Sequence, residues 1–166
     1  MLEQIHSGLI VQLIAVLILA NLSPLLAKKI LGDRFSHPID AGVLLSDGRA
    51  LFGPSKTIRG ILSSVVVTSI GSELIGLGLG IGGLVAVTAM AGDLISSFIK
   101  RRLGFETSSR ATGLDQIPEA LLPLLACEFF LPLSALDMGV IVVIFVIGEI
   151  VLSPLFHLAG IRDEPY

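Results

Sequence analysis

Residues 4–27 read QIHSGLIVQLIAVLILANLSPLLA and contain no Asp, Glu, Lys or Arg. About 20 mostly apolar residues are enough for a helix to cross a bilayer, so this stretch decides the fold class. No basic segment precedes it, it is longer than the apolar region of a signal peptide, and Lys28 and Lys29 follow it. We therefore expect a retained membrane helix here, and not a leader that is removed.

The composition of the whole chain agrees with a membrane protein. Of its 166 residues, 53% are hydrophobic and 15% are charged, whereas about 25% of the residues of a soluble domain are charged. The net charge of −3 opposes a basic surface for nucleic acid, and we expect no nucleic-acid partner. The single cysteine, Cys127, excludes an internal disulfide and a cysteine-based zinc site.

Four further apolar stretches are long enough to be membrane helices. They are Ile58–Ile75, Leu84–Leu103, Ile117–Leu136 and Met138–Ala159. The glycine-rich turn Gly76–Gly83 separates the first two of these. The sequence therefore predicts an all-α integral membrane protein with about five transmembrane helices, forming a single membrane-embedded domain over residues 1–166.

The charged residues predict the orientation of this domain. The polar loops Lys28–Thr57 and Gly104–Gln116, their edges and the C-terminal tail contain every basic residue of the chain: Lys28, Lys29, Arg34, Arg49, Lys56, Arg59, Lys100, Arg101, Arg102, Arg110 and Arg162. Five spans place these three regions on one side of the membrane, opposite Glu3, Glu73 and Asp137. By the positive-inside rule the basic side is cytoplasmic, and the N-terminus lies outside.

Asp93 is the most informative of the acidic residues within apolar stretches. An ionised group costs about 2.5–3.5 kcal/mol on insertion scales, so it needs a partner or a water-filled cavity. At about 100° per residue, Asp93 shares one helix face with Ser96, Ser97 and Lys100. The alternative is a buried salt bridge between Asp93 and Lys100. Glu128 and Glu149 are weaker signals of the same kind.

The first polar loop has the composition of a phosphate-binding segment. Residues 47–60, DGRALFGPSKTIRG, contain glycines, hydroxyls and three basic side chains, which together suit phosphate oxygens. It is not a P-loop, because Pro54 and Ser55 separate Gly53 from Lys56 and no strand precedes it. The alternative is a basic loop attracted to anionic lipid headgroups.

The second polar loop ends in GLDQIPE, residues 113–119, which supplies Asp115 and Glu119. Either carboxylate could simply favour a helix N-terminus. However, both loops and the Asp93 face converge on one side of the membrane. Carboxylates beside basic groups then suggest a site for Mg²⁺ and a polyphosphate, because Mg²⁺ is usually held by one or two carboxylates plus substrate phosphates.

These motifs resemble a known superfamily. Gly92-Asp93-Leu94, then Ser97, then Lys100-Arg101, and later Gly113-Leu114-Asp115 are similar to a pattern of the membrane CTP-dependent phosphatidate cytidylyltransferases. The small size and the loop at 47–60 resemble the archaeal branch, the CDP-archaeol synthases. The chain departs from the superfamily pattern at Gln116, where an Arg is usual, and in having a single glycine, Gly113, where two are usual.

The resemblance implies transfer of CMP from CTP to an isoprenoid ether lipid phosphate, 2,3-bis-O-geranylgeranyl-glycerol 1-phosphate, with release of pyrophosphate. It implies a cell-membrane enzyme with its active site on the cytoplasmic side. On this hypothesis Asp93 and Asp115 hold Mg²⁺ and are catalytic together with Lys100. Nucleotide phosphates are bound by Lys56, Arg59, Ser97 and Arg101, with Asp47 and Glu119 as outer members of the site.

Three other functions fit these residues less well. A CDP-alcohol phosphotransferase pattern begins at Asp47-Gly48, but Phe52 occupies the position of its Arg and its later Asp pair is absent. A small transporter or channel could use Asp93, Glu128 and Glu149 as an ion path. Against it, no inverted repeat is visible and both polar loops fall on one side. A non-catalytic assembly protein has no evident use for the clustered charges.

Overall fold

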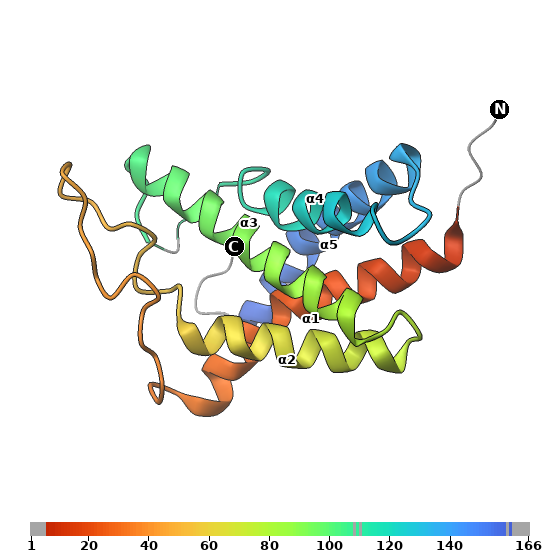
Figure 1. Ribbon diagram of the computed structural model, residues 1–166. Helices are drawn as coiled ribbons and strands as arrows, with labels where there is room; N and C mark the ends of the chain where they lie inside the picture. The colour runs from red at the N-terminus through yellow and green to blue at the C-terminus, as the bar shows by residue number, and fades with distance from the viewer. Residues whose placement is uncertain (1–5, 108, 110, 159, 161–166) are drawn as a thin grey trace.

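The computed structural model describes residues 6–107, 109, 111–158 and 160, and these residues form an all-helical bundle (Figure 1). Its helices are α1 (Ser7–Leu31), α2 (Ile58–Leu74), α3 (Leu79–Arg102), α4 (Gln116–Cys127) and α5 (Ala135–Leu158). The predicted all-α fold is thus confirmed. Three of these helices, α1, α3 and α5, are long and apolar enough to cross a membrane.

The fourth predicted span is wrong as a continuous helix. It was expected over Ile117–Leu136, but α4 ends at Cys127 after 12 residues, about 18 Å at the usual rise. The chain then turns through Pro132, which has no N–H to donate. A capping box restarts the helix, because the Ser134 N–H donates to the Asp137 carboxylate (3.2 Å) and the Asp137 N–H donates to Ser134 Oγ (3.1 Å).

The start of α3 also differs from the prediction. Residues 79–83 were expected to belong to a glycine-rich turn, but α3 already begins at Leu79. The Glu73 carboxylate accepts a hydrogen bond from the Leu79 N–H (2.8 Å) and so satisfies one of the free donors of the first turn. Gly82 then lets α2 approach closely, because a Cβ atom there would lie 2.6 Å from the Thr68 carbonyl oxygen.

α2 buries small and polar residues and exposes apolar ones. Its buried residues are Gly60, Ser64, Thr68 and Ser72, while its exposed residues include Leu62, Val66 and Ile70. The Ser64 hydroxyl donates to the Ala20 carbonyl of α1 (2.8 Å). Small residues facing neighbouring helices and large apolar residues facing outward are typical of helices packed within a bilayer. The apolar core itself lies between α1, α3, α4 and α5 and includes Leu13, Leu17, Val85, Leu124 and Ile141.

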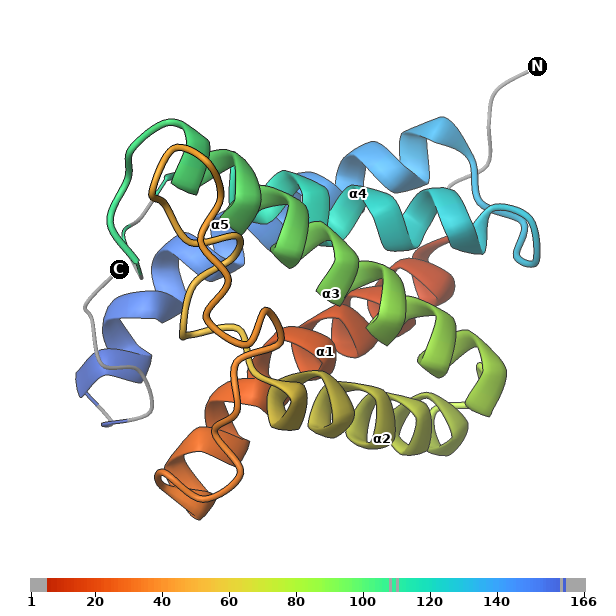
Figure 2. The same ribbon diagram turned by 60° about the vertical axis from the view of Figure 1, so that its left-hand side comes forward.

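The connections between helices alternate between two ends of the bundle (Figures 1 and 2). One end carries the loop between α1 and α2, the segment between α3 and α4, and the C-terminal end of α5. The other end carries the start of α1, the turn between α2 and α3, and the segment between α4 and α5. The basic residues that the structure describes all belong to the first end. Arg110, Arg162 and Glu3, which also entered the predicted orientation, lie outside the described residues.

Candidate active site

A cavity of about 520 Å³ opens at the basic end of the bundle, between the loop that follows α1 and parts of all five helices. Of the seven residues predicted to be catalytic or to bind phosphate, five line it: Lys56, Arg59, Asp93, Lys100 and Asp115. These residues come from the first loop, α2, α3 and the residue that precedes α4. Residues far apart in the sequence therefore meet at a single cavity, as the convergence of the two loops on the Asp93 face predicted.

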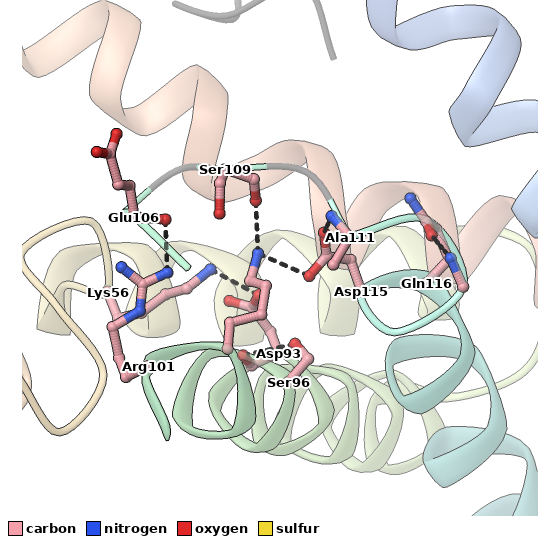
Figure 3. A network of polar contacts seen from close by, with 11 residues as sticks. Lys56, Asp93, Ser96, Arg101, Glu106, Ser109, Ala111, Asp115 and Gln116 are labelled. Atoms are coloured by element: carbon pink, nitrogen blue, oxygen red, sulfur yellow. Dashed lines mark hydrogen bonds and ion pairs between the residues drawn. The ribbon is translucent and has the colours of Figure 1, made fainter. Parts of the chain in front are cut away.

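Lys56 and Asp93 form the first ion pair of the cavity, with 2.6 Å between Nζ and Oδ1 (Figure 3). The backbone around Lys56 is held on both sides: its carbonyl accepts from the Ile39 N–H (2.8 Å), and the Thr57 hydroxyl caps α2 by accepting from the Gly60 N–H (3.1 Å). Burial alone would lower the pKa of Lys56. The nearby carboxylates, above all that of Asp93, outweigh burial and raise it, so the ammonium keeps its charge.

Lys100 and Asp115 form the second ion pair, with 2.7 Å between Nζ and Oδ1. Lys100 Nζ also donates to the Ser109 carbonyl (2.8 Å), and Asp115 Oδ2 accepts from the Ala111 N–H (2.9 Å), as Figure 3 shows. The turn that leads into α4 is closed by the Gly113 N–H, which donates to Gln116 Oε1 (2.7 Å). Asp93 and Lys100 thus each pair with a residue of a loop, and the alternative in which they pair with each other is not what the structure shows.

Gly92 explains how two carboxylates on different segments come together. A Cβ atom at this position would overlap the Pro118 carbonyl group and lie 2.8 Å from the Glu119 nitrogen. Only glycine therefore lets the backbone of α3 touch the first turn of α4 without a shift of one helix. Asp93 and Asp115, which flank this contact, face the same cavity.

The other acidic residues divide between the cavity and the surface. Glu119, which is buried, and Glu149 line the cavity, and the carboxyl group of Glu119 interacts with those of Asp93 and Glu149. Glu128 follows the last residue of α4 and is exposed, away from the cavity. Asp47 pairs with Arg102 (2.5 Å) and is not among the residues that line the cavity.

Three of the predicted phosphate ligands need separate description. Arg59 lines the cavity while donating from Nη1 to the carbonyls of Gly32 (2.7 Å) and Arg34 (2.6 Å). Ser97 is buried in the bundle and does not line the cavity. Arg101 is buried and lines a second, smaller pocket instead. The structure therefore brings together five of the seven predicted residues, without Ser97 and Arg101.

The sequence reasoning missed Asp40, which organises the first loop. Its buried carboxylate accepts hydrogen bonds from the N–H groups of Gly42 (3.0 Å), Phe52 (2.9 Å) and Gly53 (3.0 Å). Burial would raise its pKa, but these three donors outweigh burial and lower it. The signal in the sequence was an Asp two residues before a glycine, the arrangement of a turn closed by an Asp side chain.

The donor set of the cavity suits a hard cation. Carboxylates of Asp93, Asp115, Glu119 and Glu149 line it, and oxygen ligands are those that Mg²⁺ prefers. Within the described residues, no group of three or more His, Cys, Asp and Glu side chains forms a ready-made metal site. Mg²⁺ usually takes one or two carboxylates and completes its coordination with water and substrate phosphates, so the residues present fit this ion when it arrives with a polyphosphate.

Comparison with known proteins identifies the family. The model of the CarS-like CDP-archaeol synthase family matches residues 67–162, which is more than half of the chain. The chain belongs to this family. The CDP-archaeol synthase of Thermococcus onnurineus is 36% identical over 143 residues, which cover 80% of this chain and 79% of that protein. The CDP-archaeol synthase of Pyrococcus furiosus is 38% identical over 148 residues, covering 83% and 80%.

A solved structure supports the membership from the fold. It is described as an intramembrane enzyme for archaeal membrane lipid biosynthesis, it is 30% identical, and it aligns with a TM-score of 0.66 over 87% of this chain and 90% of its own. The region matched by the family model contains Asp93, Lys100 and Asp115, whereas Lys56 and Arg59 precede it. The resemblance that the motifs indicated is thus confirmed.

Proposed function

We propose that this protein transfers CMP from CTP to the phosphate of an archaeal isoprenoid ether lipid, forming CDP-archaeol and pyrophosphate. The observation that carries the proposal is the pairing of Lys56 with Asp93 and of Lys100 with Asp115 in one cavity at an end of a membrane bundle. Two cations for phosphate oxygens and two carboxylates for a divalent ion are the parts that nucleotidyl transfer needs. The names of the relatives, CDP-archaeol synthases, support the choice of lipid.

The reaction needs positioning and charge more than it needs a base. The phosphate monoester of the lipid is ionised near neutral pH, so its oxygen can attack the α-phosphorus of CTP in line while the bond to pyrophosphate breaks. Lys56, Arg59 and Lys100 neutralise the charge that gathers on the triphosphate oxygens. In the free protein the two lysine ammonium groups contact Asp93 and Asp115. We expect them to exchange these carboxylates for phosphate oxygens when the nucleotide enters.

Asp93 and Asp115 are the residues that would hold Mg²⁺ in this proposal. The bound ion supplies positive charge next to the triphosphate, which favours pyrophosphate as a leaving group. Glu119 and Glu149, which line the same cavity, are placed to accept hydrogen bonds from water around such an ion. The reaction proposed here does not use Ser97 or Arg101, because neither lines the cavity. Their role as ligands of nucleotide phosphates stays a prediction from the sequence.

We further propose that the protein resides in the cell membrane with this cavity open to the cytoplasm. The clustering of the described basic residues at one end of the bundle supports this orientation through the positive-inside rule. CTP is a cytoplasmic nucleotide, and its charge would prevent it from crossing the hydrocarbon to reach the opposite end. The lipid phosphate would enter from the same leaflet with its isoprenoid chains between helices.

The test is an assay of the purified protein with labelled CTP, Mg²⁺ and the lipid phosphate. We expect pyrophosphate release only when the lipid phosphate is present, and a preference for CTP over the other three nucleoside triphosphates. Asp93→Asn should lose turnover by on the order of 100-fold or more while the protein still elutes as a folded species. Glu128→Gln, which removes an exposed carboxylate remote from the cavity, serves as the matched control. Ion flux through liposomes without lipid-dependent pyrophosphate release would instead support a transporter.

A further inference from the structure

A second pocket lies beyond the C-terminal end of α3 and shares no lining residue with the candidate active site. Its volume is about 350 Å³, and it lies between the first loop and the segment that follows α3. Its lining residues are Arg49, Ala50, Arg101, Gly104, Phe105, Glu106 and Thr107. Two arginines therefore line a space outside the candidate active site.

Arg101 is buried with its hydrogen-bonding capacity only partly used. It is 6% exposed, and its Nη2 donates to the Glu106 carbonyl (2.7 Å), whereas its Nε is buried without a partner. Figure 3 shows the Glu106 carboxylate turned away from the Arg101 guanidinium, so the contact is to the backbone alone. A buried N–H without an acceptor is unfavourable, and a ligand that supplies oxygens would relieve it.

Arg49 reaches the same pocket from the first loop. Its Nη1 donates to the carbonyls of Arg101 (3.2 Å) and Arg102 (2.6 Å), at the end of α3. The neighbouring Arg102 is instead neutralised by an ion pair with Asp47. Among the described residues, the guanidinium hydrogen bonds of Arg49 and Arg101 go to neutral carbonyl oxygens, while the Arg49 backbone N–H donates to the Asp47 carboxylate (3.1 Å). The lining of the pocket thus carries two positive charges and the carboxylate of Glu106, while Asp47 and Asp115 act on Arg49 and Arg101 from outside the lining.

We propose that this pocket is a second anion site, which binds a phosphate group independently of the nucleotide. The paired N–H donors of a guanidinium group match the oxygens of phosphate, and two guanidinium groups can bind one phosphate from two sides. The phosphate can belong to an anionic lipid headgroup or be free in solution. Phe105, which is 43% exposed, gives the pocket an apolar side. Because residues 104–107 lead into Ser109 and Asp115, the partners of Lys100, an anion here would steady the segment that completes the active site.

The experiment measures binding of labelled inorganic phosphate to the full-length protein in neutral detergent, with CTP present at saturation. We expect phosphate binding that persists under CTP, that weakens about tenfold or more in Arg49→Gln, and that is unchanged in Lys29→Gln, which removes an exposed cation of the same end of the bundle. Should the Gln variant aggregate, Arg49→Lys keeps the charge without the fork, and we expect a smaller loss of affinity.

A second arm identifies the source of the phosphate. The protein is placed in bilayers of neutral phospholipid, with or without an anionic phospholipid, and the phosphate titration is repeated. Competition by the anionic lipid assigns the pocket to a headgroup, and its absence assigns the pocket to free phosphate. The proposal is overturned if saturating CTP abolishes phosphate binding, or if Arg49→Gln binds phosphate as the unchanged protein does. Turnover is measured separately, so this failure is distinguishable from failure of the proposed reaction.

Discussion

At the scale of single residues, the two carboxylates proposed to hold Mg²⁺, those of Asp93 and Asp115, each form an ion pair with a lysine. The two carboxylate oxygens of Asp115 make different contacts: Oδ1 pairs with Lys100, and Oδ2 accepts a hydrogen bond from the Ala111 N–H. An amide at this position keeps an oxygen for the backbone and loses the charge. This makes Asp115 suitable for separating a structural role from a role in binding a cation.

We expect Asp115→Asn to fold and to need more Mg²⁺. The Mg²⁺ concentration for half-maximal pyrophosphate release should rise by about tenfold or more, because a neutral amide is a weaker ligand for a hard cation than a carboxylate. Activity measured across a Mg²⁺ titration checks this, with Glu128→Gln as control. An unaltered Mg²⁺ dependence together with lower activity would remove Asp115 from the proposed metal site.

Asp40 provides a prediction about pH. Its pKa is lowered in the folded protein, so its contribution to holding the loop is complete above its ordinary pKa of 3.8 and is lost as the pH falls through the depressed value. At neutral pH, Asp40→Asn should speed hydrogen exchange of the Phe52 and Gly53 amides by about tenfold, because both lose a charged acceptor. Exchange followed by mass spectrometry checks this, with Asp33→Asn as control. Equal protection of these amides in the Asn variant would contradict the assignment.

At the scale of elements, the contact between α3 and α4 depends on one glycine. Gly92→Ala should destabilise the protein by about 1–3 kcal/mol and lower activity, because the added methyl group would overlap the backbone of Pro118 and Glu119. Thermal unfolding in detergent, together with the pyrophosphate assay, measures both effects.

The matched control is Gly139→Ala in α5, where an added Cβ atom meets nothing within 4 Å. This change should be neutral or stabilise the helix by up to about 1 kcal/mol. If Gly92→Ala were as stable and active as Gly139→Ala, α3 and α4 could accommodate a methyl group between them. Gly92 would then not be what sets the position of Asp93.

The elements that could be predicted from the sequence are those whose ends carry a charge or a strong turn. The absence of charges from Gln4 to Ala27 predicted α1, although the helix continues through Lys28 and Lys29 to Leu31. The stretch Ile117–Leu136 is mostly apolar and has Glu119 and Glu128 as its charged residues, so hydropathy did not reveal that α4 ends at Cys127. The sequence does contain signals for the end of one helix and the start of another, namely Pro132 and the Ser134–Asp137 capping box. These are weaker sequence signals than a long apolar run.

Most of the residues that line the cavity could be predicted from the sequence, but their pairing could not. Helical spacing placed Asp93 and Lys100 on one face, and both line the cavity. Their partners, Lys56 and Asp115, come from segments whose path is set by tertiary contacts, such as those of Asp40 and Gly92. The same spacing also suggested Ser97 for the cavity. It is buried and does not line the cavity.

At the scale of the whole molecule, the distribution of basic residues makes the orientation testable. Cys127 is buried and is the single cysteine of the sequence, so replacing it with Ala gives a clean background. New cysteines at Ser46, in the first loop, and at Phe129, beyond α4, are exposed at opposite ends of the bundle. In intact cells, a membrane-impermeant maleimide should label Phe129→Cys and spare Ser46→Cys. The reverse pattern would place the cavity outside the cell.

The distance of Asp93 from the C-terminal end of α3 bears on the route by which each substrate would reach the cavity. Arg102, the last residue of α3, lies nine positions after Asp93, about 14 Å further along the axis of an α-helix. On the proposed function and orientation, a triphosphate that binds at Asp93 would leave bulk solvent and enter the bundle, where Lys56 and Lys100 line the cavity and would replace part of its hydration. The lipid acceptor, in contrast, would reach the cavity by lateral diffusion within its own leaflet. The products would leave by the same two routes. Pyrophosphate would return to the solvent, and the CDP-lipid would diffuse laterally into the bilayer.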